Sequence, residues 1–162
     1  MKVYFLRHGI AADPQEWKGS DDDRPLTRDG IARMEREAKA IADIASDVEV
    51  IVTSPLLRAR QTADAVADRL GMTDKLVEDT RIAHGFNAAR CREIIAEHAG
   101  VRSIMLVGHE PTLSATIEAL AGEANLELKK GALACVELAD AYASGILTFL
   151  IPPKVLAALG KR

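Results

Sequence analysis

The sequence predicts a three-layer α/β/α sandwich, with a mostly parallel central sheet that ends in a C-terminal antiparallel hairpin. Two observations lead to this fold class. Short apolar runs alternate with helical patterns along most of the chain, and the last two apolar runs follow each other across a short polar connection. The chain has 162 residues, of which 48% are hydrophobic and 28% charged, so we expect one globular domain over residues 1–162.

The N-terminal part begins with a strand and a long loop. Residues 3–6 are a continuous apolar run, and the polar segment 9–26 contains Pro14, Gly19 and Pro25, as is typical of a loop. Connections of this length are uncommon and often functional. Thr27 is expected to cap a helix in which apolar residues recur at spacings of three and four. These residues are Ile31, Met34, Ala38, Ile41 and Ala45.

The remaining elements follow from the same patterns. Strands are predicted at residues 48–52, 75–78, 103–107, 132–138 and 146–151, the last two being joined by a connection over 140–145. Helices are predicted from Ser54 to Gly71, over residues 88–99 and from Pro111 to Gly122. Ser54 is expected to be the N-cap of the first of these helices, with Pro55 at its first position. A helical turn is expected after Pro152-Pro153.

Composition excludes several classes of function. The net charge of −3, the isoelectric point near 5.8 and an aromatic content of 4% argue against a nucleic-acid partner. No apolar stretch is long enough for a membrane span or a signal peptide, so we expect a cytoplasmic protein without a membrane partner. Cys91 and Cys135 form no metal-binding spacing and are interpreted as buried, reduced thiols. No long coiled-coil seam is present, and we expect a monomer.

Chemistry is expected where the predicted parallel strands end. Arg7 and His8 follow the first strand, Ser54 and then Arg58 follow the second, and His109 follows the strand at 103–107. Ligands of open α/β sheets bind beyond the carboxyl ends of the strands, close to helix N-termini that favour anions. Guanidinium groups bind phosphate oxygens bidentately, and a neutral imidazole is a good nucleophile toward phosphorus. Together these residues predict a phosphoryl-transfer site.

Each of these residues has a plainer interpretation when taken alone. His109 is compatible with a structural histidine, Arg58 with a solvated helix face, and Ser54 with a helix cap that contacts phosphate only secondarily. Gln61 lies one turn beyond Arg58 and is a candidate to orient it. The Gly9 carbonyl is a candidate to fix the His8 tautomer. The joint placement at three strand ends is what favours the catalytic interpretation.

Three ordered motifs resemble those of the histidine phosphatase superfamily. Arg7-His8-Gly9 resembles its signature, the segment 54–62 (SPLLRARQT) resembles its second motif, and the segment 108–111 (GHEP) its third. The segment 24–27 (RPLT), together with Gly30, is similar to the corresponding loop and helix start in the short branch of SixA-type phosphohistidine phosphatases. The resemblance spans essentially the whole chain and implies a phosphoglycerate mutase-like fold.

The resemblance also implies roles and a substrate. His8 would be the nucleophile that becomes phosphorylated, Arg7 and Arg58 would bind the phosphoryl oxygens, and His109 would stabilise the transition state. The resemblance implies no metal or cofactor. Ser54 and Gln61 are our further candidates for substrate binding, from their positions beside Arg58. The implied substrate is phosphohistidine on a protein such as a histidine-containing phosphotransfer domain. The alternatives are a phosphatase of small phosphate esters or phosphosugars, and a phosphate-binding module without turnover.

One family feature is not recognisable in the sequence. Many ester phosphatases of the superfamily use a glutamate after the third strand as general acid, and here only Glu78 and Asp79 are candidates. Both are equally compatible with solvated carboxylates at a strand end. The leaving group of phosphohistidine is an imidazole, whose pKa near 6.5 lets it leave protonated at neutral pH. It therefore needs less help from a general acid than an alkoxide does. The acidic run at residues 21–23 is interpreted as a solvated turn, and His84 as a candidate for the pocket rim.

Overall fold

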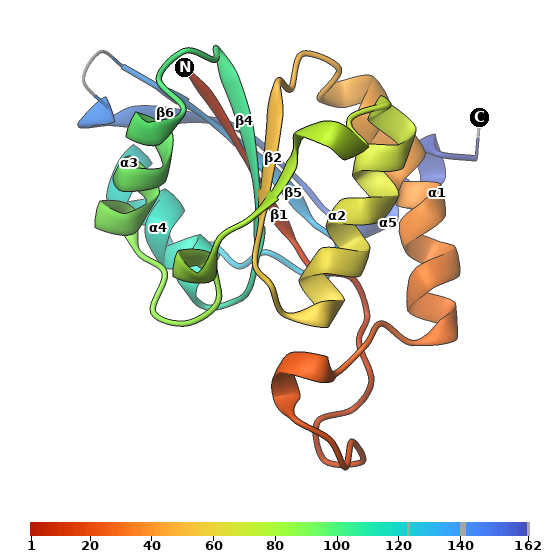
Figure 1. Ribbon diagram of the computed structural model, residues 1–162. Coiled ribbons are helices and arrows are strands. Elements are labelled where there is room, and N and C mark those ends of the chain that lie inside the picture. Colours follow the sequence, from red (N-terminus) through yellow and green to blue (C-terminus); the bar gives the residue numbers. More distant parts are fainter. Residues whose placement is uncertain (123, 140–141, 162) are drawn as a thin grey trace.

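Six strands form one mixed sheet in the computed structural model, which describes residues 1–122, 124–139 and 142–161. The strand order is β3-β2-β4-β1-β5-β6, and the first four of these strands are parallel (Figure 1). β5 is antiparallel to β1, and β6 is antiparallel to β5. The strands are β1 (Lys2–Arg7), β2 (Val50–Thr53), β3 (Leu76–Glu78), β4 (Ser103–Gly108), β5 (Leu133–Leu138) and β6 (Gly145–Ile151).

Helices cover both faces of this sheet, which confirms the predicted three-layer sandwich. α1, α2 and α5 lie on one face, and α3 and α4 lie on the other (Figure 1). They span α1 (Arg28–Ile44), α2 (Leu57–Leu70), α3 (Ala88–Glu97), α4 (Thr112–Ala121) and α5 (Pro153–Leu159). No helix in the described part of the chain is both long and apolar enough to cross a membrane.

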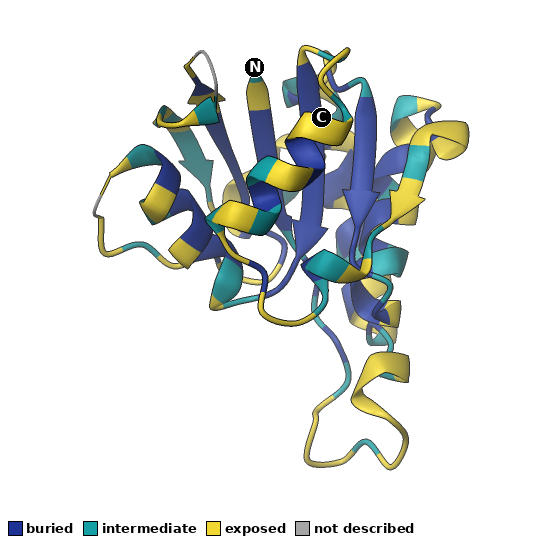
Figure 2. Ribbon diagram, turned by 60° about the vertical axis from the view of Figure 1, so that its left-hand side comes forward, coloured by how far each residue is buried: buried dark blue, intermediate teal, exposed yellow. Residues whose placement is uncertain are grey.

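Alternation along the central strands builds two separate cores. In β1, Tyr4 and Leu6 belong to the core under α1 and α2, whereas Val3 and Phe5 belong to the core under α3 and α4. Successive strand residues point to opposite faces, so a strand buried on both sides is apolar throughout. Figure 2 shows the resulting layer of buried strands between helices with exposed outer faces. The site at the strand ends therefore rests on a rigid base.

Two predicted helix starts are wrong, and one predicted core residue is exposed. α2 begins at Leu57, with Leu56 as its N-cap, because the chain bends at residues 55 and 56 after leaving β2, before the helix begins. Pro111 is the N-cap of α4 rather than its first residue. Ile31, expected in the apolar stripe of α1, is 41% exposed. The predicted connection over 140–145 falls partly on residues 140 and 141, which lie outside the described residues.

The chain end packs against α1 more closely than the expected helical turn would. Leu156 of α5 is fully buried in the core beneath α1. Gly160 lies so close to α1 that an added Cβ would stand 1.9 Å from the Arg36 carbonyl oxygen, and only glycine permits this approach. This contact fixes α5 beside the N-terminal half of the molecule.

Candidate active site

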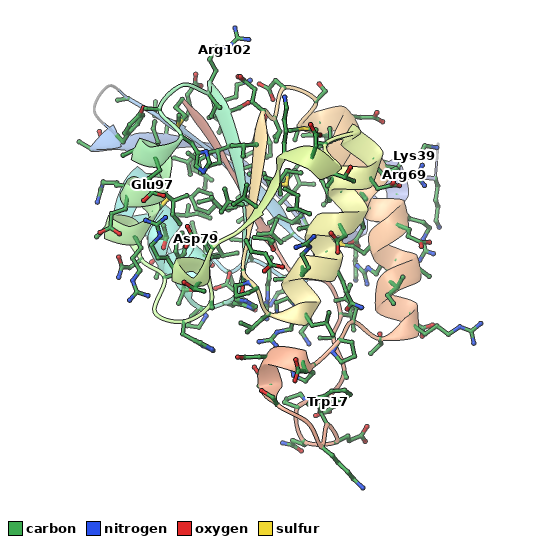
Figure 3. All side chains as sticks on the ribbon, in the orientation of Figure 1. Trp17, Lys39, Arg69, Asp79, Glu97 and Arg102 are labelled. Carbon is green, nitrogen blue, oxygen red and sulfur yellow. The ribbon has the colours of Figure 1, made fainter. Side chains whose placement is uncertain are left out.

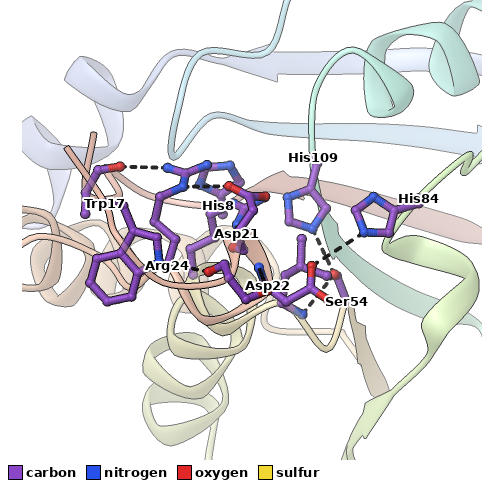
Figure 4. A network of polar contacts seen from close by, with 12 residues as sticks. His8, Trp17, Asp21, Asp22, Arg24, Ser54, His84 and His109 are labelled. Carbon is purple, nitrogen blue, oxygen red and sulfur yellow. Dashed lines mark hydrogen bonds and ion pairs between the residues drawn. The ribbon is translucent and has the colours of Figure 1, made fainter. Parts of the chain in front are cut away.

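Parallel register brings the two predicted histidines together. Arg7 at the end of β1 pairs with Gly108 at the end of β4, and the His8 amide donates to the Gly108 carbonyl at 3.1 Å. His8 and His109 therefore leave neighbouring strands at the same level. Their ring centroids are 5.2 Å apart (Figure 4). The two rings lie at the carboxyl edge of the sheet, where the sequence predicted a phosphoryl-transfer site.

The His8 ring is held in one tautomer with one nitrogen left reactive. Its Nδ1 lies 2.8 Å from the Gly9 carbonyl oxygen, which can only accept, so Nδ1 carries the proton and Nε2 keeps a lone pair. The His8 pKa is lowered to about 3, mainly by burial and in part by the nearby His109, Arg58 and Arg7, against the opposing effect of the Gly9 carbonyl. The ring is thus a neutral nucleophile near neutral pH.

Arg58 is buried at the start of α2, and both of its terminal nitrogens donate hydrogen bonds to Asp21. Its Nη1 donates to the Asp21 carbonyl at 2.7 Å, and its Nη2 donates to the Asp21 carboxylate at 2.9 Å. Asp21 itself is also held by Arg24, whose Nε lies 2.8 Å from Oδ1 (Figure 4). The acidic turn is therefore not merely solvated, as the sequence suggested, but fixes the orientation of Arg58 from across the cleft.

Arg7 approaches from the opposite side. Its Nη1 donates to the Leu128 carbonyl at 2.7 Å, which ties the end of β1 to the segment before β5. Burial lowers the Arg7 pKa from its very high ordinary value, and the negative charges of Glu110 and Glu127 act in the opposite direction. The guanidinium therefore remains a cation at any working pH.

Ser54 and His109 form a buried hydrogen-bonded pair. Ser54 Oγ accepts from the Leu56 amide at 3.2 Å and lies 2.8 Å from His109 Nε2. With that amide as donor, the serine hydroxyl is free to donate to Nε2, and a neutral His109 then carries its proton on Nδ1. Burial lowers the His109 pKa to about 4, helped by the positive charge of Arg58 and by His84. His109 thus offers a neutral N–H donor from its buried Nδ1.

Unpartnered donors concentrate at this site. Among the described residues, four buried side-chain polar atoms lack a hydrogen-bond partner, and three of them are Arg7 Nε, Arg58 Nε and His109 Nδ1. The two arginine atoms are N–H groups on cations, and His109 Nδ1 is a third N–H group when Ser54 donates to His109 Nε2. Buried donors without partners are rare in proteins and call for a specific explanation. A tetrahedral oxyanion beside His8 Nε2 would accept from this set.

A second set of residues holds the site together without facing it. Thr62 Oγ1 accepts from the Gly9 amide at 3.0 Å and donates to the Arg58 carbonyl at 2.7 Å, so it links the nucleophile's turn to α2. Sequence reasoning missed Thr62, although it stands four residues after Arg58 in the second motif. Gln61 is placed differently from the expectation, because its Oε1 accepts from the Leu26 amide at 2.8 Å and so anchors the long loop rather than Arg58.

A cleft of about 260 Å³ lies beside Arg58 and His109, and neither His8 nor Arg7 is among the residues that line it. His84, Asp21, Arg58 and His109 are among its lining residues. His84 Nε2 lies 3.5 Å from the Asp22 carboxylate and bridges the rim to the long loop (Figure 4). His84 thus does stand at the rim, where the sequence gave it as a candidate.

The two carboxylates considered as general acids are engaged elsewhere. Glu78 lies 2.5 Å from Arg60 Nη1 on α2. The Asp79 carboxylate accepts hydrogen bonds from the Arg81 guanidinium and from the Arg81 amide. These bonds hold the Asp79 pKa below its ordinary value, although partial burial acts to raise it. Figure 3 shows Asp79 beside Glu97, away from the long loop that carries Trp17. Neither carboxylate is among the residues that line the cleft.

Comparisons with known proteins agree with this geometry. Residues 3–84 match the histidine phosphatase superfamily (branch 1). The chain is 30% identical over 158 residues to the phosphohistidine phosphatase SixA of Escherichia coli, with 94% of each chain covered. It is 38% identical over 137 residues to an uncharacterized protein of a Picosynechococcus strain, with 82% of each covered. The solved structure of the protein histidine phosphatase SixA complexed with tungstate superposes with a TM-score of 0.85 at 26% identity, covering 96% of this chain and 99% of that one.

Proposed function

The chain belongs to the histidine phosphatase superfamily, and on this premise we propose that it is a metal-independent phosphatase that removes phosphate from phosphohistidine on a protein, through a phosphorylated His8. The observation that carries the proposal is the set of unpartnered N–H donors on Arg7, Arg58 and His109 around a neutral imidazole. Tungstate, bound in the related SixA structure, is a tetrahedral oxyanion like phosphate. A binding module would need the donors but not the reactive ring.

In the first step, His8 Nε2 attacks phosphorus. The Nε2–P bond forms as the P–N bond of the substrate breaks, and the electron pair of that bond goes to the leaving imidazole nitrogen, which takes up a proton from water. Arg7 and Arg58 donate hydrogen bonds to the phosphoryl oxygens and stabilise the negative charge on them in the transition state. His109 Nδ1 donates a further hydrogen bond to the same phosphoryl group. Ser54 keeps His109 in the required tautomer.

In the second step, water adds to phosphorus and the P–Nε2 bond breaks. Inorganic phosphate leaves, and His8 returns to its neutral form with Nδ1 still donating to the Gly9 carbonyl. That hydrogen bond stabilises the phosphorylated ring, because phosphorylation on Nε2 leaves Nδ1 as the only protonated nitrogen. The geometry therefore supports both displacement steps without any change of tautomer.

The choice of phosphohistidine over a phosphate ester rests on the engaged carboxylates. Glu78 and Asp79 are held in ion pairs with Arg60 and Arg81, outside the cleft. Of the two carboxylates that do line the cleft, Asp21 accepts from Arg24 and Arg58, and Glu110 accepts from the Ser114 hydroxyl and the Leu128 amide. An alkoxide leaving group, with a pKa far above neutral, gains much from a positioned acid, whereas imidazole has a pKa near 6.5 and gains little. Small phosphate esters and phosphosugars are therefore the slower substrates under this proposal.

Substrate ranking tests the proposal. We expect kcat/KM for a phosphorylated histidine-containing phosphotransfer domain to exceed that for sugar phosphates, whose leaving groups are alkoxides, by at least about tenfold, the factor that 1.4 kcal/mol of barrier represents. The His8→Asn variant serves as the background, because phosphohistidine hydrolyses on its own. EDTA is expected to leave the rates unchanged. Faster turnover of the sugar phosphates would overturn the phosphohistidine assignment and leave the ester alternative.

A further inference from the structure

A basic groove begins beside Arg7 and runs along α1 and α5. Two hollows form it, of about 600 Å³ and about 290 Å³, and they share Arg33 and Lys154 as lining residues. Arg7 lines the larger hollow, so the groove reaches the end of β1, directly before His8. We define the basic groove by its six cationic residues outside the site: Arg33, Arg36, Lys129, Lys130, Lys154 and Lys161.

The positive charge of the groove is largely uncompensated. Glu37 is 1% exposed and is held by Arg33 at 2.6 Å, and Glu127 lies 2.5 Å from Lys129. Within the described part of the chain, no ion pair engages the other four groove cations, which are Arg36, Lys130, Lys154 and Lys161. The chain as a whole carries a net charge of −3, so this surface opposes the general trend.

The groove is fixed to the nucleophile's own backbone. The Gly131 amide lies 3.2 Å from the carbonyl oxygens of Arg7 and of His8, and Arg7 Nη1 donates to the Leu128 carbonyl at 2.7 Å. The segment that carries Lys129 and Lys130 therefore cannot shift without moving the end of β1. Anything bound along this segment is placed at a set distance from the reacting phosphorus.

The groove and the long loop at the active-site mouth differ in charge. Outside the groove, the long loop carries the acidic run at residues 21–23 together with Asp13 and Glu16, against two cations, Lys18 and Arg24. The floor of the groove is apolar, formed by Ile10 with Pro152 and Pro153. Exposed lysines on long stems around an apolar floor suit an extended anionic protein surface, whereas a small-molecule site uses a few fixed polar groups in an enclosed pocket.

We propose that the basic groove docks an acidic face of the protein that carries the phosphohistidine. This inference rests on the proposed function and names the partner's chemistry and its orientation. The acidic loop repels the same partner surface, so the partner approaches along α5. Such complementarity acts mainly on the association rate and is weakened by salt.

Two phosphohistidine peptides of equal length test the proposal, one with glutamate on both sides of the phosphohistidine and one with glutamine. We expect the wild-type protein at low ionic strength to show a kcat/KM about tenfold higher for the glutamate peptide, decreasing as salt is added. The triple variant Lys129→Glu, Lys130→Glu, Lys154→Glu should lose this preference while keeping its rate with free phosphoramidate within about twofold, because none of the three touches the reacting group.

The matched control reverses three cations far from the mouth: Arg69→Glu, Lys75→Glu and Arg102→Glu. Figure 3 shows Arg69 and Arg102 at the end of the molecule opposite Trp17. This control should keep the preference. A preference that survives the groove reversal, or that disappears equally in the control, overturns the docking proposal.

The remaining outcomes separate this proposal from the proposed function. If the wild-type protein hydrolyses p-nitrophenyl phosphate but neither peptide, the phosphohistidine substrate itself is wrong, and the groove loses its partner. If both peptides are hydrolysed equally and the groove residues instead retain a DNA duplex or phosphatidylserine vesicles, the phosphatase proposal stands and the protein partner is overturned.

Discussion

The two ends of the central sheet differ in how far their polar groups are paired within the protein. At the amino end, a hollow of about 640 Å³ is lined by Lys2, Asp47 and Arg102 among others. Its charges satisfy one another: Asp47 accepts from Lys2 at 2.7 Å and from the Tyr4 hydroxyl at 2.6 Å. At the carboxyl end, the cleft is smaller, about 260 Å³, and the donors around it lack partners.

The difference between the two ends shows that buried polar groups without hydrogen-bond partners are a better indicator of a functional site than the volume of a hollow is. A buried donor without a partner costs free energy of folding, so an arrangement of several such donors in one place indicates a ligand that supplies the missing acceptors. The paired charges at the amino end stabilise the fold, and their hydrogen-bonding groups are already used within the protein rather than free to bind a ligand. The predictions below test this contrast from either end of the sheet.

The largest expected effect comes from the nucleophile. His8→Asn keeps a donor for the Gly9 carbonyl but removes Nε2, and we expect kcat on a phosphohistidine peptide to fall by about 10³-fold or more. The matched variant at the amino end, Asp47→Ala, should leave kcat unchanged within about twofold. Comparable losses in the two variants would erase the proposed difference between the ends.

The two site histidines should not titrate near neutral pH. Burial lowers the pKa of His8 to about 3 and that of His109 to about 4, so both rings stay neutral as the pH falls from 8 to 5. Their Cε1 proton resonances, measured by NMR in phosphate-free buffer and assigned with His8→Asn, should not move over that range. The same depression makes folding lose stability as the pH falls from about 6.5 toward 4, because the unfolded chain takes up protons first. A midpoint near 6.5 for either ring contradicts the prediction.

At the amino end, the expected effect is on stability alone. Asp47→Ala leaves the buried Tyr4 hydroxyl without its acceptor, and we expect the free energy of unfolding to fall by about 1–3 kcal/mol. The Lys2 ion pair adds little, since both partners are 45% exposed. Urea denaturation measures the loss, and Tyr4→Phe combined with Asp47→Ala should recover part of it. No recovery in the double variant would mean that Tyr4 is not the cause.

The smallest expected effect concerns Asp21. Its carboxylate holds Arg58 and also opposes an incoming anion, so Asp21→Asn should lower the inhibition constant of inorganic phosphate by a few-fold, as befits an exposed charge worth less than about 1 kcal/mol. Asp23→Asn removes the same charge from the same turn without a contact to Arg58. An equal change of the inhibition constant in both variants would mean that only the overall charge of the turn matters, and that the contact between Asp21 and Arg58 does not.

Much of the fold followed from local signals in the sequence. Apolar runs and the glycines and prolines that bound them located every strand, and the three strand ends placed His8, Arg58 and His109 at one edge. The start of α4 was misplaced because a proline is compatible with both the N-cap and the first helical position, and the start of α2 was misplaced because the chain bends at residues 55 and 56 before the helix begins.

The contacts that tune the site could not be predicted in the same way. Asp21 reaches Arg58 across 37 residues, Ser54 reaches His109 across 55, and Arg7 reaches Leu128 across 121. Such pairs depend on how the long loop and the segment before β5 fold back over the sheet, and no local periodicity carries that information. The role of Asp21 and the true contact of Gln61 were therefore visible only in three dimensions.

Trapping the phosphoenzyme tests the central proposal most directly. Wild-type protein mixed with a phosphohistidine substrate and quenched in alkali should carry one phosphoryl group that is stable to base and labile to acid, and peptide mapping should place it on His8. The same quench of His8→Asn should carry none. A phosphoryl group that persists in His8→Asn, or that is stable to acid, would contradict the proposed mechanism.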